Sequence, residues 1–128
     1  MFDSFLYLLR AKGLNVSLNE WIALNEALDK GLAYSGFTSF YYLCRSVLIK
    51  SEADFDKFDG AFLEFFKDID FLNDIPQELL NWLNKPKETP GNYDEEIAKQ
   101  NMALDFKRIE EMLKERLEEQ DSEHNGGK

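Results

Sequence analysis

Residues 37–66 read FTSFYYLCRSVLIKSEADFDKFDGAFLEFF, and this stretch decides the fold class because its apolar residues recur at helical spacing. The first half carries an apolar stripe broad enough for a central helix: Phe37, Phe40, Tyr41, Leu43, Cys44, Val47 and Leu48. The second half carries a row of phenylalanines: Phe55, Phe58, Phe62, Phe65 and Phe66. Between the halves, Ser51 is a natural N-cap, followed by Glu52 and Asp54, whose charges favour the positive end of a helix dipole. The stretch predicts two helices that bury aromatic side chains.

Two amphipathic segments precede this stretch. Residues 2–12 carry apolar residues at helical spacing, and Gly13 after them suits the left-handed conformation that ends a helix. Ser17 and Glu20 form a capping-box pattern, in which each side chain can satisfy a backbone N–H at the start of a helix. This second helix is expected to run to about Lys30 with five side chains directed inward: Leu18, Trp21, Ile22, Leu24 and Leu28.

The second half of the chain predicts two further helices. Pro76 suits the first position of a short helix, because its missing N–H would be unpaired there. Residues 85–92, KPKETPGN, are typical of a linker. Residues 93–120 contain no helix breaker and carry one apolar stripe: Met102, Phe106, Ile109, Leu113 and Leu117. Residues 121–128 are polar and end in glycines, so we expect a disordered tail.

These segments predict an all-α fold, with a bundle of about five short helices in residues 1–84 and a long C-terminal amphipathic helix. The 128 residues, 44% apolar and including 11 Phe, can bury one core without disulfides or metal. We expect the long helix to pack on the bundle, because Met102, Phe106 and Ile109 would otherwise expose a large apolar patch. Projection of this helix toward a following domain is the alternative.

The charge and composition of the chain exclude several classes of partner. The net charge is −10, and it is uneven, since residues 1–67 carry 7 basic and 9 acidic groups while residues 68–128 carry 8 and 16. Nucleic acid and anionic lipid would repel such a chain, and the recognition helix of a helix-turn-helix near residues 17–50 would have only Arg45 and Lys50 to meet phosphates. No apolar run reaches the roughly 20 residues that span a bilayer, and no signal peptide is apparent. The one cysteine fits a reducing compartment, so we expect a cytoplasmic protein.

Residues 54–60, DFDKFDG, resemble a calcium-binding loop only superficially. Counted from Asp54, the third ligand position holds Phe58, the turn glycine is displaced to Gly60, and the closing bidentate position falls on Phe65. A helix start with solvated carboxylates and buried phenylalanines explains the pattern better.

Catalytic, cofactor-binding and metal-binding residues are not indicated anywhere else in the sequence. Cys44 lies within an apolar stripe and is interpreted as a buried structural thiol without a basic neighbour to activate it. The one histidine, His124, lies in the polar tail and makes no closed metal shell. There is no glycine-rich phosphate loop. The sequence therefore predicts a protein that is not an enzyme and needs no cofactor.

Aromatic residues near the ends of the predicted elements are the candidates for contact with a partner protein: Phe37, Phe71, Trp82 and Tyr93. For Trp82, as for Trp21, packing in the core is the commoner role.

Three stretches carry a family resemblance: LRAKGLNVSLNEW (9–21), YYLCRSVLIKSEADFDKF (41–58) and RLEEQDSEHNGGK (116–128). Together they resemble the N-terminal region of CoxE-like proteins that carry a von Willebrand factor A (VWA) domain. The resemblance implies that such a domain, about 150 residues or more, follows in the whole protein. Its metal site is built around Asp-x-Ser-x-Ser, which does not occur here, so no metal ligand is carried onto this chain.

The resemblance also implies a partner. CoxE-like proteins are commonly encoded beside MoxR-type AAA+ ATPases and are thought to be their adaptors, in chaperone-like remodelling or cofactor insertion into client enzymes. We therefore expect a helical interaction domain that binds the ATPase or its client, as a monomer or weak homodimer. A structural or self-associating module without ATPase contact is the alternative.

Overall fold

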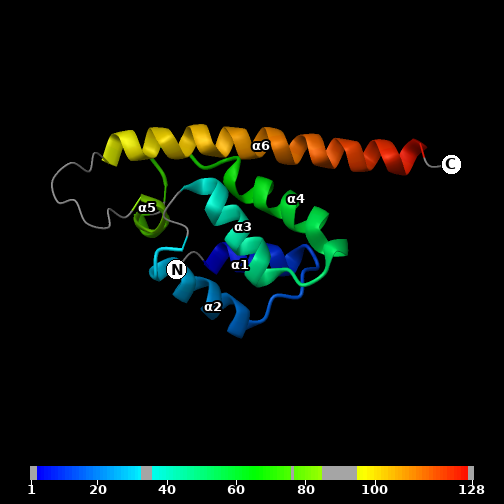
Figure 1. The fold of residues 1–128 in the computed structure, drawn as a ribbon, viewed down its shortest axis with the longest axis horizontal. Coiled ribbons are helices and arrows are strands. Elements are labelled where there is room, and N and C mark those ends of the chain that lie inside the picture. Colours follow the sequence, from blue (N-terminus) through cyan, green and yellow to red (C-terminus); the bar gives the residue numbers. More distant parts are fainter. Residues whose placement is uncertain (1–2, 33–35, 76, 85–94, 127–128) are drawn as a thin grey trace.

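The computed structural model describes residues 3–32, 36–75, 77–84 and 95–126, with side chains omitted at 83, 84, 95 and 120–126. The elements in this part of the chain follow in the order α1 (Asp3–Ala11), α2 (Leu18–Asp29), α3 (Phe37–Leu48), the 3-10 helix η1 (Glu52–Asp54), α4 (Phe55–Phe66), α5 (Gln77–Asn84) and α6 (Glu95–Gly126) (Figure 1). No described residue is in a strand. The predicted all-α fold, with short helices and one long C-terminal helix, is confirmed.

The predicted start of α2 is confirmed in detail. Ser17 Oγ accepts a hydrogen bond from Glu20 N at 3.1 Å, and Glu20 Oε1 accepts one from Ser17 N at 2.8 Å. Two backbone donors that a helix start leaves unpaired are thus satisfied reciprocally. Before this cap, Gly13 ends α1 with φ 90°, a conformation that side chains with a Cβ disfavour. The loop between α1 and α2 is therefore fixed at both ends.

The cap at Ser51 serves a different helix from the one predicted. Its Oγ accepts from Ala53 N at 3.2 Å and so begins η1, and α4 follows with Asp54 at its N-cap position. The signal was correctly placed, but the first turn winds as a 3-10 helix, a common form of helix terminus.

Aromatic side chains fill the centre of the bundle. Phe62 on α4 is fully buried, and its ring centroid lies 5.7 Å from that of Phe37 on α3 and 4.7 Å from that of Phe66. Phe5 on α1 contacts the same cluster, with its centroid 6.1 Å from that of Phe62. Edge-to-face and tilted ring pairs of this kind stabilise a core beyond the area that they bury.

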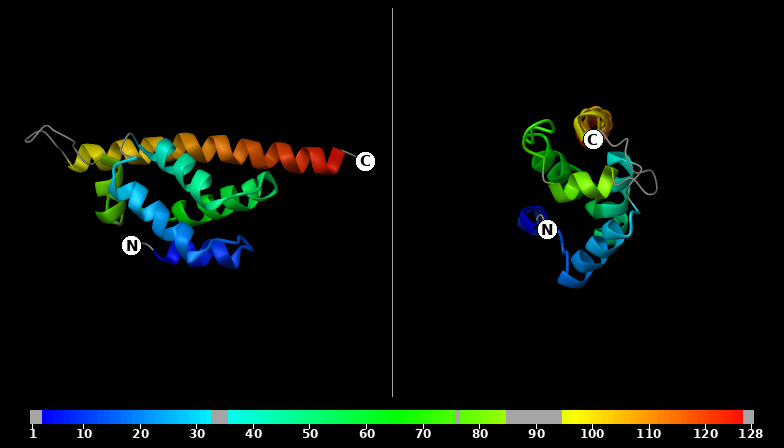
Figure 2. Two further views of the ribbon diagram at one scale, coloured as in Figure 1. Left: turned by 60° about the horizontal axis from the view of Figure 1, so that its bottom comes forward. Right: turned by 90° about the vertical axis from the view of Figure 1, so that its left-hand side faces the viewer.

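Helix α6 runs across the bundle and contacts α3, α4 and α5 (Figures 1 and 2). Its stripe joins the common core: Met102, Phe106, Ile109 and Leu113 are buried, and Leu117 is partly buried. Asp105 Oδ2 also accepts a hydrogen bond from Phe37 N at 3.3 Å, which supplies the cap that Gly36 lacks. Any larger residue at Gly36 would place its Cβ 2.7 Å from that oxygen. The helix continues to Gly126, whereas the sequence predicts an end at residue 120. No helix breaker lies between residue 120 and Gly126, so the backbone stays helical up to that glycine.

Two inward positions predicted for α2 are wrong. Leu18 is 59% exposed and Ile22 is 43% exposed, while Trp21, Leu24 and Leu28 are buried as predicted. At 100° per residue, the buried face is centred on those three side chains, and Ile22 lies about a third of a turn away from it.

The remaining position on the buried face of α2 belongs to Asn25, which the apolar pattern did not indicate. Asn25 is 7% exposed, and its Nδ2 donates to Trp21 O at 2.8 Å. This hydrogen bond to the preceding turn lets a polar side chain occupy a core position.

Candidate functional site

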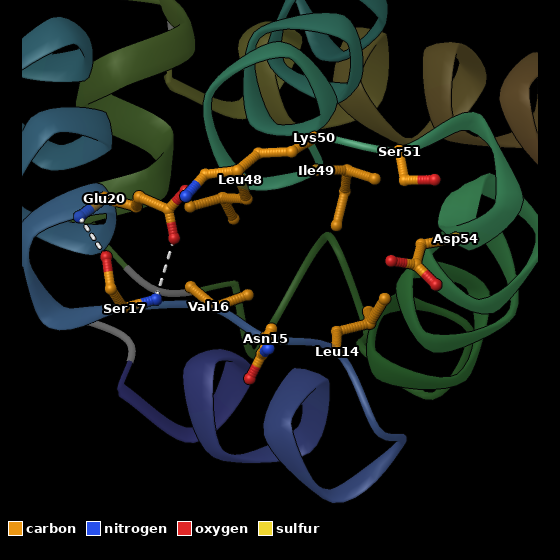
Figure 3. A pocket seen from close by; sticks show the side chains of 10 residues that line it. All are labelled: Leu14, Asn15, Val16, Ser17, Glu20, Leu48, Ile49, Lys50, Ser51 and Asp54. Carbon is orange, nitrogen blue, oxygen red and sulfur yellow. Dashed lines mark hydrogen bonds and ion pairs between the residues drawn. The ribbon is translucent and has the colours of Figure 1, made fainter.

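A cleft of about 450 Å³ opens between the loop that joins α1 to α2 and the segment that joins α3 to α4 (Figure 3). Its lining residues come from both segments: Leu14, Asn15, Val16, Ser17, Glu20, Leu48, Ile49, Lys50, Ser51 and Asp54. A second hollow, of about 370 Å³, is lined by Leu72, Asn73, Glu96 and Lys99, none of which is buried. The first cleft has the volume typical of ligand sites and is the better candidate, because buried residues form part of its wall.

The inner wall of the cleft is apolar. Leu14, Val16, Leu48 and Ile49 are each at most 8% exposed, and they belong to the core cluster. Arg10 Nε donates to Val16 O at 3.0 Å, which holds the loop after α1 against the bundle. The wall is therefore a fixed part of the scaffold.

One side of the cleft carries the ion pair between Glu20 and Lys50 (Figure 3). Lys50 Nζ lies 2.9 Å from Glu20 Oε2, and the two side chains differ sharply in exposure, at 78% for Lys50 and 14% for Glu20. Hydrogen bonding from Ser17 N, with a smaller contribution from Lys50, lowers the pKa of Glu20. Glu20 is thus an ionised carboxylate at neutral pH.

The two oxygens of Glu20 have different partners. Oε1 accepts from Ser17 N, whereas Oε2 is buried and lies 2.9 Å from the ammonium of Lys50. In the part of the chain that is described, Lys50 is thus the partner of this oxygen. A charge-assisted contact of this kind is stronger than one between neutral groups.

The opposite side of the cleft is acidic and polar. Asp54 is half-buried, and its side chain makes no capping hydrogen bond to α4. Ser51 lies beside it (Figure 3). The charged side chains that line the cleft are thus Glu20, Asp54 and Lys50, two anions and one cation. The C-terminal end of α3 also lies at the cleft, and the negative end of its dipole favours a cation there.

A second polar cluster lies between α3 and α4, with Tyr41 and Asp59 buried and Arg45 partly exposed. Asp59 is 2% exposed, and its Oδ1 accepts a hydrogen bond from Tyr41 Oη at 2.5 Å. Arg45 Nη1 donates to the same hydroxyl at 3.3 Å, and its guanidinium stacks 4.2 Å from the ring centroid of Phe55. We call Tyr41, Arg45 and Asp59 the buried cluster.

Burial raises the pKa values of both Tyr41 and Asp59 in the buried cluster. Burial raises the pKa of Asp59, although the Tyr41 hydrogen bond and the charges of Arg45 and Arg116 oppose this shift. Burial, together with the neighbouring Asp59 carboxylate, also raises the pKa of Tyr41. Neither of the two hollows described above is lined by Tyr41, Arg45 or Asp59.

Three of the four aromatic residues predicted for partner contact lie in the core. Phe37 is 0% exposed, Phe71 is 7% exposed and Trp82 is 5% exposed. Trp82 Nε1 donates to Asp29 Oδ1 at 2.7 Å, which ties α5 to the end of α2. Tyr93 lies outside the described residues. In this fold the three placed side chains therefore offer almost no surface to another protein.

The predicted interpretation of residues 54–60 is partly confirmed. Phe58 is fully buried at the start of α4, and Asp56 is exposed. Asp59 corrects the prediction of solvated carboxylates, because the hydroxyl of Tyr41 satisfies it inside the bundle. No group of metal-binding side chains occurs among the described residues.

The sequence analysis assigns neither Cys44 nor His124 a reactive or metal-binding role, and the structure describes the side chain of Cys44. Cys44 is fully buried, and this burial raises the pKa of its thiol, as expected for a structural cysteine. The side chain of His124 lies outside the described residues.

Residues 3–68 match the model of the CoxE N-terminal helical bundle domain. The chain belongs to the CoxE N-terminal helical bundle family. The matched residues include α1 to α4, and with them the whole cleft and the buried cluster. Neither the curated proteins nor the solved structures gave a match to the chain.

Membership in the CoxE helical bundle family confirms the resemblance and favours a non-catalytic module. None of the helices described here is sufficiently long and apolar to cross a bilayer. The cleft combines an apolar wall with ionised side chains, an arrangement that can bind a ligand with an apolar and a charged part.

Proposed function

We propose that this chain is a non-catalytic protein-interaction domain of a cytoplasmic CoxE-like adaptor that works with a MoxR-type AAA+ ATPase. In this role the adaptor assists chaperone-like remodelling or cofactor insertion into client enzymes. The observation that carries the proposal is the family match of residues 3–68, which is the part of the chain that forms the cleft.

The geometry supports binding in two ways. The cleft lies between two loops that are fixed by the Ser17 and Ser51 caps, and binding sites on loops held by a rigid scaffold are common in proteins. The aromatic core and the buried cluster are enclosed, so they stabilise the scaffold and leave the surface for recognition.

A pull-down tests the proposal directly. Residues 1–128, immobilised through an N-terminal tag, should retain the cognate MoxR-type ATPase in the presence of ATP or ADP. Binding that requires the VWA domain as well would show that the contact lies elsewhere in the adaptor. An unrelated acidic helical bundle of similar net charge is the control for non-specific attraction.

Self-association is the second candidate, and the outer surface of α6 favours it. Ile97 is 54% exposed and Leu104 is 58% exposed, and residues seven apart lie on one side of a helix. Light scattering at high protein concentration tests self-association, because a monomeric mass would exclude it. A Leu104→Ser variant that converts a dimer to a monomer would support it.

A further inference from the structure

We propose that the cleft binds a lysine or arginine side chain of the partner protein, at a position where apolar residues flank that side chain in the partner. In the free protein, Lys50 pairs with the carboxylate that the partner's cation would bind. This inference builds on the proposed function, because it names the chemistry that the adaptor recognises. The carboxylate of Glu20 is the primary recognition group, and Asp54 is the second.

The first argument is the state of the Glu20 carboxylate. It is held in place by Ser17 N through Oε1, so its position does not depend on Lys50. Oε2 is buried, and its partner is the ammonium of Lys50, 2.9 Å away. A cationic side chain that approaches along the cleft would take over this charge-assisted contact.

The second argument is that Lys50 can be displaced. Its side chain is 78% exposed, so the ammonium can move into water without losing packing. Lys50 neutralises Glu20 in the free protein, and Glu20 is not left unpaired when Lys50 leaves, because the incoming cation takes the same carboxylate oxygen.

The third argument is the complementarity of the whole cleft to an amphipathic cation. Lys and Arg side chains carry an apolar stem and a charged head. The buried wall formed by Leu14, Val16 and Ile49 fits the stem, while Glu20 and Asp54 flank the space in which the head would lie (Figure 3). Once Lys50 moves away, two carboxylates remain, and the net charge of −10 steers a basic partner toward the protein.

A peptide titration followed by NMR tests the inference. The probe is acetyl-Leu-Arg-Leu-amide, and the control is the same peptide with neutral citrulline in place of arginine. The arginine peptide should shift the backbone amide signals of Ser17, Glu20, Lys50 and Ser51 with weak affinity. The citrulline peptide should bind at least about tenfold more weakly, because it cannot form the charge-assisted contact.

Two substitutions in the cleft have opposite expected effects. Glu20→Gln keeps the capping box, since glutamine also accepts from Ser17 N. It should lower the affinity for the arginine peptide about tenfold. Lys50→Met removes the competing cation and should strengthen binding by up to about fivefold. A folding defect cannot produce this gain, so the second variant separates recognition from stability.

The matched control removes the same charge elsewhere. Glu111→Gln on α6, an element that does not line the cleft, should change the affinity by less than about twofold at physiological salt. The inference is overturned if citrulline binds as well as arginine, if the shifts spread over α6 instead of the cleft, or if Lys50→Met weakens binding.

The same variants distinguish this inference from the proposed function. If the ATPase is retained equally by the wild type and by Glu20→Gln, the cleft is not the contact and the inference fails while the proposed function stands. If the arginine peptide binds in the cleft but the ATPase is not retained, the proposed function fails while the recognition chemistry stands.

Discussion

Glu20 and Asp59 are two largely buried carboxylates near a basic side chain, yet their pKa values are shifted in opposite directions. Glu20 pairs with Lys50 at the rim of the cleft, and Asp59 accepts from Tyr41 beneath Arg45. The pKa of Glu20 is lowered, chiefly by a backbone N–H, while the pKa of Asp59 is raised, chiefly by burial.

The difference follows from the surroundings of each carboxylate. At the helix start, a fixed backbone donor stabilises the charge of Glu20 while the cleft keeps it within reach of solvent. Within the bundle, Asp59 loses water on all sides and gains only a hydroxyl donor and more distant cations. The surroundings of Glu20 allow its paired cation to be exchanged, whereas those of Asp59 hold one fixed hydrogen bond.

The largest expected effect is therefore in the buried cluster. Asp59→Ala should destabilise the protein by about 2–3 kcal/mol, because it leaves the buried Tyr41 hydroxyl without its acceptor. Urea unfolding followed by circular dichroism measures the change.

A double substitution sharpens this prediction. Tyr41→Phe combined with Asp59→Leu removes donor and acceptor together and should recover most of the loss, since apolar replacements can be nearly neutral. A double variant that is less stable than Asp59→Ala would show that the buried cluster contributes more to stability than the hydrogen bond between Tyr41 and Asp59.

The helices could be predicted from the sequence because their signals are local. Ser17 and Glu20 are three residues apart, and the apolar stripe of α6 repeats within one segment. The error at Ile22 has a local cause too, since apolar residues spread over more than one side of α2 and only packing selects the buried side.

The candidate site could not be predicted, because it forms only when distant segments pack. Glu20 and Lys50 meet through the packing of α2 against α3, and nothing near either residue indicates the other. The burial of Asp59 depends on Tyr41, which lies 18 residues earlier. One signal was available: a tyrosine on a buried stripe needs an acceptor for its hydroxyl.

An intermediate effect is expected at the cap that holds Glu20. Ser17→Ala should destabilise the protein by about 1 kcal/mol, because Glu20 N loses its acceptor at the start of α2. Ser46→Ala is the control, since that hydroxyl donates to Tyr42 O inside an exposed helix turn and its loss should be almost neutral. Equal effects on the melting temperature would contradict the role of the cap.

The two carboxylates should also give opposite pH dependence. Because the folded pKa of Asp59 lies above its ordinary value of 3.8, the wild type should lose stability relative to Asp59→Asn as the pH rises through that folded pKa. The folded pKa of Glu20 lies below its ordinary value of 4.5, so the wild type should gain stability relative to Glu20→Gln as the pH rises toward that value. Urea unfolding between about pH 3 and pH 7 measures both differences. Slopes of the same sign for the two variants would refute the contrast.

The smallest effect is expected at a third carboxylate, which has neither burial nor a cap. Glu64 Oε1 lies 2.8 Å from Lys12 Nζ, a distance like that of the Glu20–Lys50 pair, but both side chains are more than 40% exposed. Solvent therefore screens the attraction, and Glu64→Gln should change the free energy of unfolding by less than about 0.5 kcal/mol. Unfolding at low and high salt checks this. A larger loss that persists at high salt would mean that ion-pair distance alone governs stability here, and that the fixed donor from Ser17 is not what distinguishes Glu20.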